Sequence, residues 1–525
     1  MRRERSERIA IAAGALLFGL VFIKNAWVCD DAYIVLRSIE QLFEGNGPRW
    51  NPHERVQVFT SPLWFWYVAL FRVFVEDAFV LLVSASAAAC AAFLYLLSRS
   101  FRSGWTFLLA AAALTLSPAF MDFTTAGLEN PLCYLAAAIF LKGYSGACGK
   151  RPAGKEGYVP HVLLAVSFGA VVMCRYDLIL LFAPPFLYAS AVCGGNLTAR
   201  RRAALISASL IPIASWTVFS VIYYGSPLPN PFYAKLGSGI PAGALVSQGW
   251  RYIAASIRGE PLTILVIASG MTLPALLRRY RYMPVSAGML LTIAYVLAAG
   301  GDFMRGRFLS HVFLVSAVCI GVLLEDRLFA AGSGAKPRKN RRSAVAAAAA
   351  ALAAYGILFP GVPASTWKGY TDTGIVDGIA DERGFYFRNS SIWRYGSRKS
   401  LLFPAHPWSS EGYAYSRPGE RAIVVAGSGI GFFGYWAGTR TIIIDPLAVS
   451  DPFLARLPAD ARYERRPGHY RREVPEWYVM ALAGRKVDIP ESPEGRLYED
   501  VTLAARSDVL FSKKRLRAVL SLLSR

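Results

Sequence analysis

The chain has 525 residues, of which 54% are hydrophobic and only 18% are charged, and its mean hydropathy is +0.36. A soluble protein of this length needs more charge to cover its surface, so the composition excludes an ordinary soluble globular protein. The formal net charge of +22 would suit nucleic-acid binding, but the excess lies in short clusters between apolar runs, as in the cytoplasmic loops of membrane proteins. The clusters contain Arg2, Arg3 and Arg5; Arg99 and Arg102; Lys150 and Arg151; Arg200, Arg201 and Arg202; Arg278, Arg279 and Arg281; and Lys336, Arg338, Lys339, Arg341 and Arg342.

Apolar runs of bilayer-spanning length recur along the first two thirds of the chain. With the basic clusters placed in the cytoplasm, the crossings number about eleven, and this odd number leaves the C-terminal segment outside. We predict transmembrane helices near residues 8–28, 78–98, 104–120, 130–143, 160–174, 178–193, 203–222, 262–277, 284–299, 309–324 and 343–359. The first run lacks a small-residue cleavage site before Cys29, which indicates a retained helix rather than a signal peptide. The short, Trp-rich run 62–74 is expected at the membrane interface.

The first loop outside the membrane begins with two adjacent carboxylates, Asp30 and Asp31. The residues that follow have apolar side chains at helical spacing, which predicts an amphipathic helix on the membrane surface. These residues are Val35, Leu36, Ile39, Leu42 and Phe43, and the stretch 45–48 ends the helix. Asp30 is placed to act as its N-cap. One carboxylate can cap while the other faces a cavity, and their mutual repulsion would raise one pKa, as suits a general base.

Further acidic motifs fall in the other outward loops, where ionisable residues are costly and tend to mark function. They lie at helix ends rather than at helix centres, which favours an active site open to one side over a transport path. The set comprises Asp122, Glu129, the Arg175-Tyr-Asp177 motif, the loop 223–235, and Asp302 with Arg305 and Arg307.

The seven cysteines form no CxxC pair, so neither a zinc site nor a disulfide framework is predicted. After residue 360 the chain becomes more polar, and runs such as 422–426 and 441–444 predict strands of a small α/β domain. Gly427-Ser-Gly429-Ile-Gly431 lacks the third glycine of a dinucleotide-binding GxGxxG motif and shows no clean helix after it, so we interpret it as a packing turn. Asp445, Asp451 and His469 are weaker candidates for acceptor binding.

A series of short motifs runs along nearly the whole chain. They are Asp30-Asp31-Ala-Tyr, Asn51-Pro-His-Glu-Arg-Val, Thr60-Ser-Pro-Leu-Trp, Gly127-Leu-Glu-Asn-Pro, Arg175-Tyr-Asp, Pro229-Asn-Pro-Phe-Tyr-Ala-Lys, Gly301-Asp-Phe-Met-Arg-Gly-Arg-Phe, Gly431-Phe-Phe-Gly-Tyr-Trp-Ala-Gly, Ile444-Asp-Pro, Ser450-Asp-Pro and Arg466-Pro-Gly-His. As an ordered set they resemble GT-C superfamily glycosyltransferases, and among these the mycobacterial terminal β-(1→2) arabinofuranosyltransferases and their bacterial relatives. His53, Gln57 and Tyr176 depart from the usual Gly, Glu and Arg-Pro-Asp pattern, which leaves the exact sugar and acceptor open.

The resemblance implies a polytopic α-helical membrane protein of GT-C type, with a transmembrane catalytic domain over residues 1–360 and a small extracytoplasmic α/β domain over 361–525. It also implies transfer of a sugar, arabinofuranose or another pentose, from a polyprenyl-phosphate donor to a cell-envelope glycan or glycoconjugate. The reaction would take place on the outer face of the bacterial cytoplasmic membrane. The expected partners are that donor, the acceptor and membrane lipids, with no nucleic acid.

The candidate site residues follow from the same chemistry. The base that deprotonates the acceptor hydroxyl is expected to be Asp30 or Asp31. The departing phosphate needs cations, and Arg recognises phosphate through two parallel N–H groups. The candidates for the donor phosphate are Arg305, Arg307, Lys235 and Arg175, and those for the sugar or acceptor are Glu129, Asp177, Asn230, Tyr233, Asp302 and His53.

Each of these residues could instead have a purely structural role. Glu129 and Asp177 would equally suit a buried salt bridge with Arg175, the arginines would suit contacts with lipid headgroups, and a lone His53 or His311 more often packs than binds phosphate. No motif has a diagnostic metal-ligand spacing, so the metal is unknown and a divalent cation stays open as a cofactor. The alternative functions are a lipid-linked sugar flippase or transporter, a non-catalytic assembly scaffold, and a protein O-mannosyltransferase-like enzyme.

Overall fold

The computed structural model describes residues 4–149, 158–193, 197–236, 240–328, 337–359, 361–366, 374–416, 422–427, 429–460, 462–463 and 467–524. Arg2, Arg3, Lys150, Arg151, Lys336 and the motif residue Arg466 lie outside these ranges. The described chain is mostly helical and forms two compact units, each assembled from segments that are distant in sequence. Unit 1 comprises Met1–Val28, Leu82–Ile211 and Ala242–Ile392, and unit 2 comprises Cys29–Leu81, Pro212–Pro241 and Trp393–Arg525.

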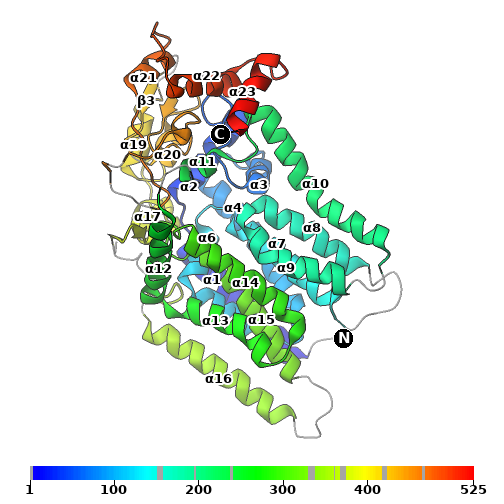
Figure 1. The fold of residues 1–525 in the computed structure, drawn as a ribbon. Coiled ribbons are helices and arrows are strands. Elements are labelled where there is room, and N and C mark those ends of the chain that lie inside the picture. Colours follow the sequence, from blue (N-terminus) through cyan, green and yellow to red (C-terminus); the bar gives the residue numbers. More distant parts are fainter. Residues whose placement is uncertain are drawn as a thin grey trace. The chain divides into compact units, whose positions relative to one another are not determined.

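Unit 1 is a helical bundle with one small hairpin. Its helices are α1 (Arg5–Asn25), most of α4 (Ala78–Ser100), α5 (Gly104–Leu116), α6 (Pro118–Thr125), α7 (Asn130–Ala147), α8 (Val159–Cys174), α9 (Ile179–Tyr188), the first half of α10 (Ala199–Tyr224), α12 (Ala242–Gly259), α13 (Pro261–Leu276), α14 (Met283–Ala298), α15 (Ser310–Leu328), α16 (Pro337–Leu358) and α17 (Glu382–Ser390). Helix α7 packs against α8, α9 against α14, and α13 against α15, as Figure 1 shows. Strands β1 (Ile375–Val376) and β2 (Ile379–Ala380) pair antiparallel.

Large apolar side chains point outward from several of these helices. Leu16 of α1 is 63% exposed, Leu265 of α13 is 61% exposed and Leu290 of α14 is 59% exposed. Exposed apolar surface of this kind is typical of helices that face lipid. Among the described residues, six helical segments are long and apolar enough to cross a membrane, or eight when two bent helix pairs are each counted as one span. The predicted spans 160–174 and 343–359 correspond to shorter apolar helices, Val159–Cys174 and Val345–Leu358, and the count of about eleven stays a prediction.

Two of the candidate spans are broken. Helices α5 and α6 meet at an angle of 80°, and α12 and α13 meet at 113°. Ser117 caps α6 and Glu260 caps α13, each followed by a proline at the first helical position, where the missing N–H costs nothing. The two breaks are joined, because the Ser117 hydroxyl donates to a Glu260 carboxylate oxygen at 3.2 Å. A single span was predicted over 104–120, where the structure has the two helices α5 and α6, and α12 was not predicted.

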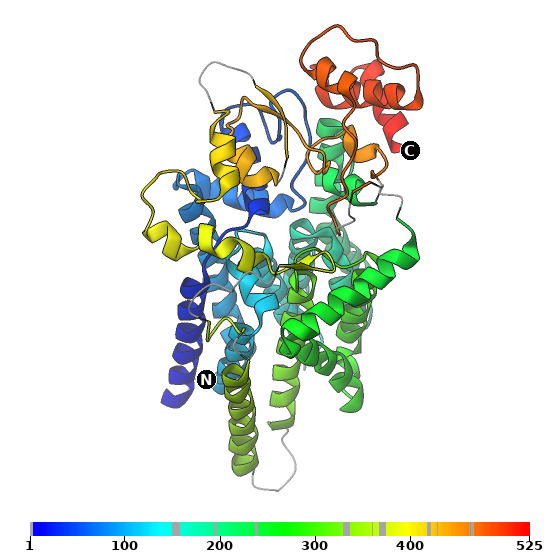
Figure 2. The same cartoon turned by 90° about the vertical axis from the view of Figure 1, so that its left-hand side faces the viewer.

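Unit 2 combines short helices with a two-stranded parallel sheet. Its elements are α2 (Asp30–Phe43), α3 (Pro62–Arg72), α11 (Asn230–Leu236), α19 (Pro407–Tyr413), β3 (Ile423–Val425), α20 (Ile430–Trp436), β4 (Ile442–Ile444), α21 (Glu476–Leu482), α22 (Pro493–Arg506) and α23 (Lys513–Leu523), and α18 (Ile392–Gly396) begins at its boundary. Strand β3 pairs parallel with β4, from Ile423 opposite Ile442 to Val425 opposite Ile444. Helix α22 packs against α23 near the C-terminus (Figure 2).

The parallel pair β3–β4 agrees with the two strands predicted at 422–426 and 441–444. The compact units do not divide at residue 360, since the segment Ile375–Ile392 belongs to unit 1 and Cys29–Leu81 belongs to unit 2. Backbone hydrogen bonds of Ala380 explain why the segment Ile375–Ile392 belongs to unit 1. The N–H of Ala380 donates to Phe303 at 2.7 Å and its carbonyl accepts from Arg305 at 3.0 Å, which fixes this segment to the Asp302–Arg307 loop.

Candidate active site

The predicted base Asp30 lies in unit 2, in the first turn of α2. Its carboxylate accepts the backbone N–H of Gly431 at 2.9 Å and that of Phe432 at 2.7 Å. These are N–H groups of the first turn of α20, which have no partner within their own helix. The prediction that Asp30 caps α2 was wrong, because Cys29 holds the N-cap position of α2 and Asp30 instead satisfies the start of α20.

The electrostatic surroundings of Asp30 suit a general base. The side chain is 94% buried, and burial raises the pKa of Asp30 to about 7, helped by the negative charges of Asp31 and Asp445 and opposed by the two backbone hydrogen bonds. A base works best when its pKa lies near the working pH. Asp31, the next residue of α2, is half-buried.

Glycine is required where α2 and α20 meet. A side chain on Gly431 would overlap the carbonyl oxygen of Asp30, and one on Gly434 would approach Trp50 and Arg37. Arg37 closes the same junction by donating to the carbonyl oxygens of Gly434, Gly438 and Thr441. The motif that begins at Gly431 therefore allows close packing. A helix does follow the glycine-rich turn, contrary to expectation, but Asp30 occupies its first N–H groups.

A second buried network in unit 2 holds the first loop to the end of the chain. Glu54 accepts from Asn51 at 3.2 Å and from Arg506 at 3.1 Å, and His53 lies 3.4 Å from it. Burial opposes ionisation, but the charges of His53 and Arg506 lower the pKa of Glu54. Asp451 has its pKa raised by burial and then by the charge of Glu54, and its carboxylate accepts the Tyr478 hydroxyl at 2.8 Å. His53 thus lies beside a structural carboxylate.

Helix α11 contains three predicted ligands with different surroundings. The Asn230 amide is buried and donates to the carbonyl oxygens of Ala448, Val449 and Asp451. Its role is therefore to fix the backbone of that segment. The Tyr233 hydroxyl accepts from Ser226 at 2.8 Å, and its ring lies 4.5 Å from the Arg456 guanidinium. Lys235 is exposed at the end of α11.

Five of the predicted site residues come together in unit 1. Arg175 binds Asp177 through two hydrogen bonds of 3.0 and 2.8 Å and binds Glu129 at 3.0 Å. Arg307 reaches the same Glu129 oxygen at 3.2 Å, and its other nitrogen lies 3.9 Å from Asp302. The buried salt bridge, which the sequence left as the competing interpretation for Glu129 and Asp177, is what the structure shows. His311 is buried and contacts the Ser310 hydroxyl at 3.2 Å.

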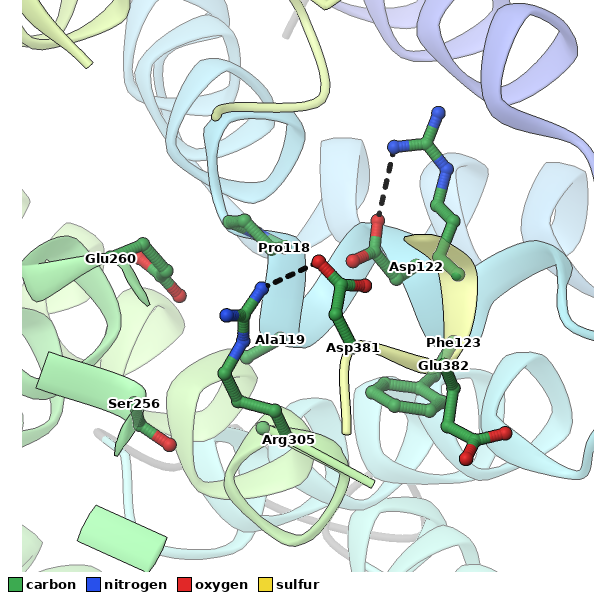
Figure 3. A pocket seen from close by; sticks show the side chains of 11 residues that line it. Pro118, Ala119, Asp122, Phe123, Ser256, Glu260, Arg305, Asp381 and Glu382 are labelled. Atoms are coloured by element: carbon green, nitrogen blue, oxygen red, sulfur yellow. Dashed lines mark hydrogen bonds and ion pairs between the residues drawn. The ribbon is translucent and has the colours of Figure 1, made fainter. Parts of the chain in front are cut away.

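Arg305 lies in a different setting from Arg307. It donates to Asp381 at 2.8 Å and lines a cavity in unit 1 with Asp122, Glu260 and Arg383 (Figure 3). Glu260, Asp381 and Arg383 were not among the site residues predicted from the sequence. A cap signal was present at Glu260, since an acceptor side chain precedes Pro261. Asp381 lies within the predicted C-terminal domain, so its contact with Arg305 was not expected.

The cysteines also depart from expectation. Cys148 and Cys193 form a disulfide, although the sequence predicted none, because 45 residues separate them and no motif marks the pair. The other five cysteines, Cys29, Cys90, Cys133, Cys174 and Cys319, are buried as free thiols. Among the described residues, no three His, Cys, Asp or Glu side chains are grouped so that they could hold a metal ion.

Sequence comparison relates this geometry to known enzymes. The chain is 27% identical over 363 residues to the terminal beta-(1->2)-arabinofuranosyltransferase of Mycobacterium tuberculosis, covering 60% of this chain and 55% of that protein. It is 28% identical over 341 residues to the enzyme of the same name from Corynebacterium glutamicum, covering 57% and 48%. The matches thus span about half the length of both relatives. No protein-family model matches the chain.

Structure comparison agrees at the level of the fold. ArnT from Cupriavidus metallidurans, solved with undecaprenyl phosphate bound, aligns with a TM-score of 0.51 and 12% identity, over 83% of this chain and 85% of that one. The predicted resemblance to GT-C glycosyltransferases is therefore confirmed. The chain is a multi-pass membrane protein whose fold matches that of ArnT.

Proposed function

We propose that this protein is a membrane glycosyltransferase that moves a pentose, most simply arabinofuranose, from a polyprenyl-phosphate donor to a cell-envelope glycan. Two curated relatives named as arabinofuranosyltransferases support the sugar, and the lipid phosphate bound to ArnT supports the donor. The reaction is proposed for the outer face of the bacterial cytoplasmic membrane, where the predicted topology places the first loop.

The observation that carries the proposal is the setting of Asp30. Its carboxylate is held by the N–H groups of Gly431 and Phe432, which leaves each oxygen a further lone pair for a substrate proton. A pKa of about 7 keeps a large fraction ionised near neutral pH while the group stays basic enough to accept a proton. Asp30 is therefore proposed as the base, and Asp31 as the neighbour whose charge helps to keep that pKa high.

The transfer is a single displacement in which atoms and charge balance. The acceptor hydroxyl gives its proton to Asp30 while its oxygen forms a bond to the anomeric carbon of the donor. The bond between that carbon and the phosphate oxygen breaks, and the polyprenyl phosphate leaves with the electron pair. Because phosphate is a competent leaving group, the site needs a base and a cation and does not need an acid.

The cation for the phosphate is proposed to be Lys235. Arg175, Arg305 and Arg307 each hold at least one carboxylate partner, which offsets their charge. Lys235 is exposed, lies in helix α11, whose first residue Asn230 is held by hydrogen bonds, and belongs to the same unit as Asp30. A lysine acts on phosphate as a point charge without a fixed fork geometry.

A lipid-linked sugar transporter is the second candidate, and the helix breaks favour it. Transporters bind their cargo at interrupted helices, and the breaks at Ser117 and Glu260 lie beside Asp122. The related arabinofuranosyltransferases count against this function, since transport alone would leave the base at Asp30 without a role.

Transfer from a synthetic prenyl-phosphate arabinofuranose to an arabinan oligosaccharide tests the proposal. Purified full-length protein is expected to release prenyl phosphate and extend the oligosaccharide by one residue, and mass spectrometry would detect both products. The same preparation in vesicles is expected not to translocate the lipid-linked sugar. Translocation without any extended product, from this donor or from hexose donors, would overturn the proposal in favour of the transporter.

A further inference from the structure

Helix α23 of unit 2 has two apolar faces. One is buried where α23 packs against α22, and it comprises Ala518, Val519 and Leu522. The other is exposed, since Leu516 is 59%, Leu520 is 56% and Leu523 is 45% exposed. The helical spacing of these three residues places them on one stripe, which we call the leucine stripe. An exposed apolar stripe marks a surface that contacts a membrane or another protein.

Exposed cations border the leucine stripe. Arg517 lies one turn before Leu520, Lys513 lies one turn before Arg517, and Lys514 is exposed beside them. After Asp508, residues 509–524 include these cations and the buried Arg515 but no acidic residue. Lys513 and Lys514 occupy the first turn of α23, where the helix dipole disfavours positive charge. An anionic partner at this end of the helix would offset that cost.

Arg515 fixes α23 to one end of a candidate membrane span. Its guanidinium donates to the carbonyl oxygen of Ala504 in α22 at 2.9 Å and to that of Tyr223 in α10 at 3.3 Å. Val519 lies against Gly225, directly after the last residue of α10. Helix α23 therefore lies beside the end of α10, as Figure 1 shows.

The length of α10 places this end at the boundary of the bilayer. From Arg202 to Ile222 the helix rises about 30 Å, which matches the thickness of the hydrocarbon core. Large apolar side chains of α10 stay exposed up to Val218 and Ile222, as on a helix that faces lipid. Because Tyr223 follows directly, the carbonyl group that holds Arg515 lies where lipid meets water.

This position and these side chains select a lipid surface as the partner. Interfacial amphipathic helices bury an apolar face at the edge of the hydrocarbon, and their cations attract anionic lipids. A second copy of the chain is a poorer partner for the same face. It would bring Lys513, Lys514 and Arg517 against their own counterparts, and like charges that face each other are unfavourable.

We propose that α23 docks on an anionic phospholipid surface at this end of α10. The leucine stripe enters the edge of the hydrocarbon, and Lys513, Lys514 and Arg517 bind the phosphates of the headgroups. Through α22, whose Arg506 donates to Glu54 at 3.1 Å, the docked helix also anchors the first-loop network of unit 2. The proposal concerns a lipid contact and does not depend on sugar transfer.

The test uses full-length protein at one copy per nanodisc, with an environment-sensitive fluorophore on Leu520→Cys. The free cysteines of the described chain are buried, and wild-type protein treated with the same reagent gives the background. The discs contain phosphatidylcholine with phosphatidylglycerol, and lipids brominated in their acyl chains quench a fluorophore that reaches the hydrocarbon. The fluorophore on Leu520→Cys should shift to shorter emission wavelength and lose intensity to the brominated lipids.

Glu499→Cys is the matched control for position. Glu499 is exposed on the neighbouring helix α22, and its charge suits water rather than lipid. A fluorophore there should keep its emission wavelength and intensity in brominated discs. Equal quenching at the two positions, or none at Leu520→Cys, would overturn the docking of α23. A fluorophore on Leu520→Cys that shifts but is not quenched would also overturn it, since that result would show contact with protein.

Two charge variants in the Leu520→Cys background test the choice of lipid. The first combines Lys513→Gln, Lys514→Gln and Arg517→Gln, and the second removes the same charge from other exposed positions of unit 2 by Arg485→Gln, Lys486→Gln and Arg496→Gln. Each cation near an anionic surface is expected to favour docking by about fivefold. Phosphatidylglycerol should therefore increase the quenching in the parent and in the second variant, but not in the first. Quenching that ignores phosphatidylglycerol in all three proteins would overturn the binding of anionic headgroups.

Discussion

The carboxylate of Asp30 accepts the backbone N–H of Phe432 at 2.7 Å, although 402 positions separate the two residues in the chain. The contact ties the start of α2 to the start of α20 and makes the conformation of each depend on the other. It also defines what Asp30 can do, because a carboxylate held by two N–H groups has a fixed direction in which it can accept a proton.

Replacing Asp31 with Asn should shift the pH dependence of transfer without abolishing it. Burial is the main cause of the raised pKa of Asp30, and the charge of Asp31 adds to it. Removing that charge lowers the pKa of Asp30, so kcat/KM should begin to rise at a lower pH than in the wild type, where the acid limb is expected near pH 7. A pH profile that is unchanged, or that moves to higher pH, would show that Asp30 is not the titrating base.

The substitution Gly431→Ala should destabilise unit 2 strongly, because the new methyl group overlaps the carbonyl oxygen of Asp30 and nothing there can move cheaply. Overpacking at such a site costs about 1–3 kcal/mol or more. Gly427→Ala is the control, since a side chain there meets nothing within 4 Å. Thermal unfolding in detergent would show a lowered Tm for the first variant and an unchanged Tm for the second. Equal Tm values would contradict the close approach of α2 and α20.

Local patterns in the sequence predicted many of the helices and strands. They could not predict contacts between residues that are far apart in the chain. Apolar runs located the apolar helices, of which six to eight of those described could cross a membrane, and β-branched residues located β3 and β4. The bends were missed because hydropathy carries no information on direction, although the Ser117-Pro118 and Glu260-Pro261 pairs mark helix starts. The salt bridges of Arg175 were foreseen as an alternative, since Asp177 is only two residues away.

The sequence identified most of the residues of the candidate site, but it identified only some of the residues that they contact. The adjacent carboxylates stood out as Asp30 and Asp31, but no local signal pairs Asp30 with Gly431. The same holds for Arg305 and Asp381, which lie 76 positions apart. Asp381 follows a long run of small and polar residues, where composition suggested a separate domain.

Replacing Arg175 with Gln should destabilise the protein far more than removing an exposed arginine. Arg175 is buried between Glu129 and Asp177, and its loss leaves two carboxylates without their main partner, at a cost of about 3–5 kcal/mol. Arg258→Gln removes an ion pair whose arginine side chain is 63% exposed and should cost about 1 kcal/mol or less. Comparable losses in unfolding midpoint for both variants would contradict the buried network.

Counting thiols tests the disulfide between Cys148 and Cys193. Protein denatured without reductant should react with an alkylating reagent at five cysteines, and reduced protein at all seven. The variant Cys148→Ser should expose one further thiol without reductant, namely that of Cys193. Seven reactive thiols in the unreduced wild-type protein would show that the bond does not form.

The most direct test of the central claim is the rate of sugar transfer by Asp30→Asn compared with Asp445→Asn. Both residues are buried aspartates of unit 2 whose carboxylates accept two backbone N–H groups, for Asp445 those of Leu447 and Ser450. The two substitutions therefore disturb the fold in the same way, and only one removes the proposed base. With saturating acceptor and above about pH 8, where Asp30 is ionised with or without the charge of Asp445, transfer per folded molecule should fall by about 100-fold or more in Asp30→Asn and by far less in Asp445→Asn. Equal rates in the two variants would show that Asp30 serves the fold and that the acceptor is deprotonated elsewhere.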